Sequence, residues 1–256
     1  MKKISIFMII LLAFTAHAQK QPKKPAQQPT QTSQPTQPSQ PATTSTQPNT
    51  QPPINPLTEH FAKKNALATR WNDLDQAKDA LYDLIAENPG NDSLIYVLSV
   101  YYFENRQYVS AVLVAQDLLT NNPKNINLLQ LAATCYEALG IKEKALTHYE
   151  SVYLINSSTA VLYKMSILQY DLKKFAESKT NADILMTKRD LDSLKVTMND
   201  VQNKQKEYPL KASILNIQGL LALQANDKPA AKKAFEAALA VSPDFPLAKE
   251  NLAKLK

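Results

Sequence analysis

The sequence ends two runs of helix-forming residues with the same kind of stop. The first stop is "ENPGN" at residues 87–91, and the second is "NNPKN" at residues 121–125. A Pro cannot continue a helix because it lacks the backbone N–H and clashes with the preceding turn. Two neighbouring helices that end alike, at Pro89 and again at Pro123, predict a repeated helical unit.

Residues at fixed distances before the stops support this prediction. We take the stops at Pro89, Pro123, Ser157 and Pro243. The residue twelve positions earlier is always Ala, namely Ala77, Ala111, Ala145 and Ala231. Eight, five and twenty-one positions earlier the residues are mostly apolar: Leu81, Ala115, Tyr149 and Phe235; Leu84, Leu118, Val152 and Ala238; Ala68, Tyr102, Tyr136 and Ala222. Steps of three and four residues lie on one helix face, so these positions predict the packed faces of helix pairs.

The interval from Pro89 to Pro123, and from Pro123 to Ser157, resembles that of the tetratricopeptide repeat family, a helix–turn–helix unit of about 34 residues. The clearest copy, 212–243, contains Gly219 and Ala222, and its second helix matches the family's Ala-x3-Phe…Pro signature with Ala231, Phe235, Ala238 and Pro243. The first copy has Lys64 and Asn65 where Leu and Gly are usual, as expected for a terminal repeat whose outer face meets water. The resemblance implies an all-α, right-handed α-solenoid of about five helix pairs.

We expect repeats at about 58–91, 92–125, 126–158, 159–191 and 212–245, and a capping helix at 246–256. The surplus segment 192–211, "DSLKVTMNDVQNKQKEYPLK", is either a continuation of the preceding helix or a β-hairpin insert. Leu194, Val196 and Met198 alternate with polar residues, and Asn and Asp gather in the middle of the segment. This pattern favours the hairpin.

The N-terminus has the layout of a signal peptide over residues 1–18: "MKK", an apolar run of eleven residues, and "AHA" before the expected cut after Ala18. The apolar run is short for a membrane span, so an uncleaved anchor is the less favoured alternative. The residue directly after the cut is not Cys, since Cys135 is the only Cys in the chain. We therefore expect no lipid anchor at that position. We therefore expect an exported protein, in the periplasm first of all, with secretion or surface association as alternatives.

Residues 19–56 form a segment, here called the tether, with ten Pro, ten Gln, seven Thr and three Ser. Ile54 is its one aliphatic residue larger than Ala, so we expect a disordered, extended linker. Five of the 29 basic residues precede Leu57, which leaves 24 against 23 acidic residues in the folded part. The N-terminal segments therefore supply five of the six net positive charges, the folded part has a net charge of only +1, and nucleic acid is not an expected partner.

The sequence offers little for catalysis or for a cofactor. His60 and His148 have no metal-binding spacing with other ligands, and there is no Gly-rich phosphate loop. We expect no enzyme activity, no cofactor and no metal, and we expect Cys135 to be a small buried residue. Asp92-Ser93-Leu94 and Asp192-Ser193-Leu194 are similar to O-glycosylation acceptors of some bacteria, but a helix cap is favoured at 92 and the second site stays open.

Stacked helix pairs form a curved, extended surface. The repeat register predicts nine partner-binding residues on its concave side: Tyr96, Val100, Phe103, Gln130, Thr134, Glu137, Tyr163, Ile167 and Tyr170. The alternative is that these side chains pack against neighbouring repeats. We expect a non-catalytic scaffold of the cell envelope that binds a helix or extended peptide, and a periplasmic chaperone or assembly factor is the alternative. The oligomeric state is left open.

Overall fold

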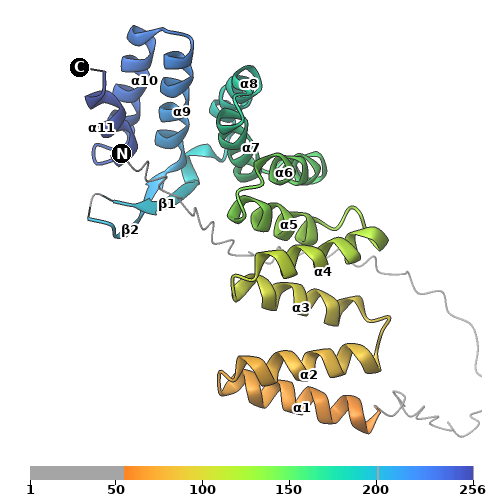
Figure 1. The fold of residues 1–256 in the computed structure, drawn as a ribbon. Helices are drawn as coiled ribbons and strands as arrows, with labels where there is room; N and C mark the ends of the chain where they lie inside the picture. Colours follow the sequence, from red (N-terminus) through yellow and green to blue (C-terminus); the bar gives the residue numbers. More distant parts are fainter. Residues whose placement is uncertain (1–54, 201, 256) are drawn as a thin grey trace, which may run out of the picture.

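The computed structural model describes residues 55–200 and 202–255. The predicted signal peptide and all but the last two residues of the tether lie outside the described residues. The described chain is a stack of helix pairs (Figure 1). The pairs are α1 (Pro56–Arg70) with α2 (Leu74–Glu87), α3 (Asp92–Glu104) with α4 (Tyr108–Asn121), α5 (Ile126–Ala138) with α6 (Lys142–Asn156), α7 (Thr159–Asp171) with α8 (Phe175–Met186), and α9 (Leu210–Gln224) with α10 (Lys228–Val241).

A final helix, α11 (Pro246–Ala253), packs against α10 and α9. Phe245, which precedes it, and Ala248 within it are both buried. This helix covers the apolar face that the fifth pair would otherwise leave open at the C-terminal end. The predicted all-α solenoid of about five pairs with a capping helix is therefore confirmed. No helix in the described ranges has both the length and the apolar character that crossing a membrane requires.

The turn inside each pair contains one residue with positive φ, at the same place in the repeat. These residues are Asn72 (56°), Arg106 (58°), Gly140 (76°), Lys173 (61°) and Asn226 (58°). Only Gly adopts this conformation without cost, and Asn tolerates it better than Arg or Lys does. The first three follow one another at the same interval as the stops at Pro89 and Pro123, so the sequence period is also present in the backbone.

Asn residues of the two opening stops begin the helices that follow. The side chain of Asn91 accepts hydrogen bonds from the backbone N–H groups of Ser93 and Leu94, and Asn125 does the same one repeat later. The prediction of a cap at Asp92 is wrong by one residue, because Asp92 is already the first helical residue. Its carboxylate instead lies in the first turn, where the helix dipole favours a negative charge.

The helix faces predicted from the fixed distances are packed. The four Ala residues twelve positions before the stops are at most 4% exposed. The eight residues at distances of eight and five are also buried. At the distance of twenty-one, Ala68 and Tyr136 are buried, whereas Tyr102 and Ala222 are partly exposed. The small Ala residues twelve positions before the stops let the two helices of a pair approach closely.

A β-hairpin interrupts the helices between the fourth and fifth pairs, as predicted. A short 3-10 turn (Leu191–Ser193) leads into β1 (Lys195–Asn199), which pairs antiparallel with β2 (Gln205–Pro209). Because α8 already ends at Met186, the alternative of a continued helix is wrong. The helix α9 begins directly after Pro209, whose missing N–H is no loss before the first turn of a helix.

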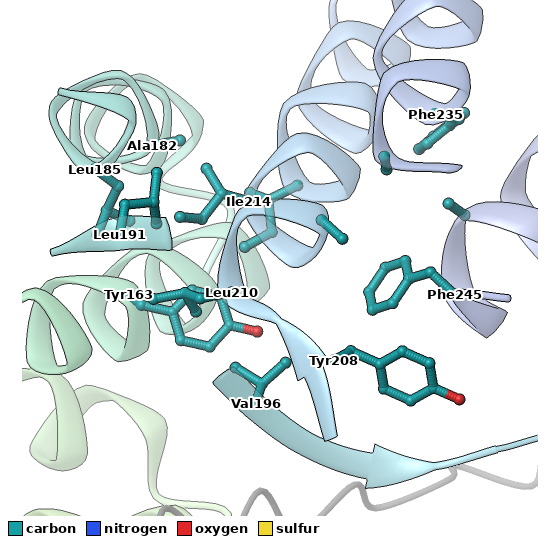
Figure 2. Close-up of a cluster of buried hydrophobic side chains, with 14 of the residues drawn as sticks. Tyr163, Ala182, Leu185, Leu191, Val196, Tyr208, Leu210, Ile214, Phe235 and Phe245 are labelled. Atoms are coloured by element: carbon teal, nitrogen blue, oxygen red, sulfur yellow. The ribbon is translucent and has the colours of Figure 1, made fainter. Parts of the chain in front are cut away.

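The inner side of the hairpin closes the largest apolar cluster, which joins α7 through α11. Val196 and Tyr208 are almost completely buried, and the ring of Tyr208 meets that of Phe245 edge to face, with centroids 5.5 Å apart (Figure 2). In Figure 1 the axes of α9 and α10 run across the direction of the first three pairs. The fifth pair therefore does not continue the direction of the first three pairs, and the hairpin lies beside it.

Candidate partner-binding surface

Three of the nine predicted residues form an apolar row on α3. Tyr96, Val100 and Phe103 follow one another at steps of four and three residues, which places them on one face of the helix. Each is partly exposed. Tyr96 and Phe103 also contact buried apolar clusters, whereas Val100 belongs to none of the three clusters in the described residues. The row is therefore anchored at both ends and open at its centre.

The equivalent row on α5 is polar. Gln130, Thr134 and Glu137 are partly exposed, and the Thr134 hydroxyl donates to the Gln130 carbonyl at 2.8 Å. The Glu137 carboxylate accepts from Lys164 Nζ at 2.8 Å and from the Tyr149 hydroxyl at 3.0 Å. These bonds join α5 to α6 and α7, so the α5 row has a fixed shape.

Lys164 and Tyr149 are the residues of this network that the sequence reasoning missed. The Lys164 side chain is only 8% exposed and forms an ion pair with Glu137, and burying such a charge without a partner would be costly. Burial, together with the nearby Glu137 charge, raises the pKa of Tyr149, so the phenol stays protonated and donates. A Lys at a helical position ordinarily indicates a solvated face, so no pattern in the sequence indicated this pair.

The predicted row on α7 lies largely in the core. Tyr163 is 1% exposed, lies near Val196 and Leu210, and shares a hydrogen bond with the Ser213 hydroxyl (Figure 2). The prediction that Tyr163 offers an exposed partner-binding side chain is therefore wrong, because the hairpin and α9 cover it. Burial raises the pKa of this phenol to about 12.

Ile167 and Tyr170 are partly exposed but pack against the same cluster. The amide of Gln224, at the end of α9, also donates to the Tyr170 hydroxyl at 3.3 Å. For α7 the alternative of packing against a neighbouring pair therefore fits better than the partner-binding prediction. The two rows that remain available, on α3 and α5, are adjacent in the stack.

The residues considered for chemistry have structural surroundings. Cys135 is fully buried, as predicted, and burial raises its pKa to about 12, so it is a thiol and not a thiolate. The His148 ring stacks on Tyr136. Burial lowers the pKa of His148, and the nearby positive charge of Lys144 lowers it further. No group of three or more His, Cys, Asp or Glu in the described ranges is placed to hold a metal ion. Ser93 and Ser193 are both exposed, and their glycosylation stays a prediction.

Comparison with known proteins shows which proteins have a similar sequence or a similar stack of helix pairs. The family model described as anaphase-promoting complex, cyclosome, subunit 3 matches residues 73–152, from the residue before α2 into α6. A search of curated proteins gave no match. Among solved structures, YrrB, described as a TPR protein with an unusual peptide-binding site, is 14% identical with a TM-score of 0.59, over 78% of this chain and 98% of YrrB.

Structures of MamA are similar to the same extent. MamA from Desulfovibrio magneticus RS-1, in a structure that runs from residue 41 to the end, is 12% identical with a TM-score of 0.57, over 75% of this chain and 99% of that one. A second crystal structure of MamA is 13% identical with a TM-score of 0.55, over 77% of this chain and 94% of that one. These identities show a shared fold and nothing finer.

The described chain is thus an α-solenoid built from stacked helix pairs. Its fold is that of the tetratricopeptide repeat, which confirms the resemblance drawn from the period of the sequence.

Proposed function

We propose that this protein is a non-catalytic scaffold that binds a helix or an extended peptide of another protein on the rows of α3 and α5. The observation that carries the proposal is the row of Tyr96, Val100 and Phe103, which is apolar yet partly exposed. Aromatic side chains at such places bury a large rigid surface, and Tyr can also form a hydrogen bond. Tetratricopeptide solenoids are in general interaction modules, and this fold supports the same role here.

The polar row on α5 complements the apolar row on α3. Gln130 can donate and accept hydrogen bonds, and the backbone of an extended peptide needs both. Because Lys164 and Tyr149 hold Glu137 in place, the α5 row is preorganised, and binding does not have to order it. A partner segment lying along both rows would contact apolar side chains on one side and polar groups on the other.

We also propose that the protein acts in the cell envelope. The support is the signal-peptide layout of residues 1–18, which is the arrangement of an exported chain. Export can be checked by fractionation of cells that produce the full-length protein with an epitope tag at its C-terminus. Recovery of the full-length chain, uncut and in the cytoplasm, would overturn this part of the proposal.

The binding proposal is tested by Val100→Glu in the full chain, with crosslinking and recovery from native envelopes. Val109→Glu is the matched control, because Val109 is 57% exposed on α4, outside both rows. We expect the wild type and the control to recover one stoichiometric crosslinked partner, and Val100→Glu to lose it while its circular dichroism stays unchanged. Recovery of the same partner by Val100→Glu, or of many weakly bound proteins by the wild type, would count against the scaffold.

A further inference from the structure

A hollow of about 340 Å³ opens beside Tyr96, at the end of the α3 row. It lies where the beginnings of α3 and α5 meet the end of α4. Its volume is at the lower end of the roughly 300–1,000 Å³ that ligand pockets span. The hollow can therefore take one large side chain and the backbone beside it, but it is small for a cofactor.

The floor of the hollow is apolar. Leu118 and Leu128 are nearly buried there and belong to a small cluster with Ala115, separate from the two larger clusters. Tyr96 packs against this cluster and also belongs to the α3 row, so the hollow and the row are continuous. Val97 lines the hollow and is 49% exposed, so its side chain is available to contact a ligand.

The rim of the hollow is polar and carries one negative charge. Ser93, Asn122, Asn125 and Asn127 supply neutral polar groups, and Asp92 is the one charged residue in the lining. Asp92 is exposed, and no Lys or Arg stands among the lining residues to neutralise it. A ligand with a positive charge beside an apolar group would complement this rim and floor together.

We propose that this hollow is the anchor pocket for the partner segment, and that it takes an aliphatic or aromatic side chain with a Lys or Arg next to it in the partner's sequence. The inference rests on the proposed function, because the same segment would continue along the α3 row. Burial of the apolar side chain against Val97, Leu118 and Leu128 supplies affinity. The cation beside Asp92 sets the direction in which the segment lies.

The test pans a phage-displayed library of random peptides on the full chain and measures each enriched peptide by fluorescence polarisation. Val97, Val100 and Val109 each receive the same change to Glu, so the variants report on the pocket, the row and a control surface. We expect enriched peptides to carry an apolar residue beside Lys or Arg. Val97→Glu should weaken binding by about tenfold or more, and Val109→Glu should leave it unchanged.

Asp92→Asn tests the charge separately. It should weaken binding several-fold and make the affinity less dependent on salt, because one ion pair is removed. Val97→Ser is measured beside Val97→Glu, because it removes the apolar contact without adding a second carboxylate near Asp92 that would attract the same cation. It should also weaken binding, and it replaces Val97→Glu if that variant fails to fold by circular dichroism.

The outcomes separate this inference from the proposed function. Loss of binding in Val100→Glu alone would overturn the pocket and keep the row. Unchanged binding in both variants, or a library that yields no peptide for the wild type, would overturn both. Enriched peptides without Lys or Arg beside the apolar residue would overturn the assigned partner chemistry.

Discussion

Gly219 lies on α9 at the point where the Phe235 ring of α10 comes closest to the backbone. A Cβ atom added to Gly219 would collide with that ring. Phe235 is fully buried, so it cannot move away without disturbing its other contacts. The repeat pattern identified both positions from the sequence, because the copy at 212–243 places Gly219 in its first helix and Phe235 in its second. It could not show how close the contact is, since that depends on coordinates.

At the residue scale we predict that Gly219→Ala destabilises the protein. Overpacking costs about 1–3 kcal/mol, and the higher helix propensity of Ala returns up to about 1 kcal/mol, so we expect a net loss of about 1–2 kcal/mol in the free energy of unfolding. Gly90→Ala is the matched control, because nothing lies within 4 Å of a Cβ atom there. We expect it to be neutral or slightly stabilising. Urea denaturation measures both changes in the free energy of unfolding. Equal effects would show that the Phe235 ring can make room for a Cβ atom at Gly219.

At the scale of elements, the hairpin could be predicted from the alternation of Val196 and Met198, but its packing could not. The repeat register points Tyr163 toward the concave side, as it does for Tyr96. In the structure the hairpin brings α9 over this part of α7, and Tyr163 meets Ser213, 50 residues later in the chain. A pattern read within single repeats carries no information about a contact over that distance. The predicted site was therefore supported on α3 and α5 and corrected on α7.

We predict accordingly that Tyr163→Ser lowers the stability of the protein, and that any loss of binding follows from unfolding and not from a lost contact with the partner. Removing a buried aromatic ring costs about 3–5 kcal/mol. Tyr163→Phe keeps the ring and loses the bond to Ser213, so it should cost only about 1 kcal/mol. Tyr170→Ser, at a partly exposed position, should cost less than Tyr163→Ser. Thermal unfolding followed by circular dichroism gives the order, and a Tyr163→Ser variant with an unchanged melting temperature would contradict the burial of this residue.

At the scale of the whole molecule, the stability of a solenoid is close to a sum over its repeats and their interfaces. Three apolar clusters of the described residues connect α3 through α11. None of the three includes a residue of α1 or α2, whose buried residues are Ala68, Ala77, Ala80, Leu81 and Leu84. The side-chain hydrogen bonds from this pair to α3 include those of Tyr82 with Tyr102 and of Tyr101 with the Leu74 carbonyl. The sequence pointed to this difference through Lys64 and Asn65, which replace core residues of the repeat.

We therefore predict that the first pair opens independently of the others. The amide hydrogens of α1 and α2 should exchange faster than those of α9 and α10, which belong to the largest cluster. Local opening of the first pair breaks few apolar contacts, so it needs less free energy. Hydrogen exchange followed by mass spectrometry measures this for each helix. Tyr82→Phe removes one partner of the hydroxyl pair with Tyr102, 2.6 Å apart, and should speed exchange in α1 and α2 alone. Equal protection across all pairs would mean that the solenoid unfolds as one cooperative unit, and that the two tyrosines join the first pair to the rest more firmly than their contacts indicate.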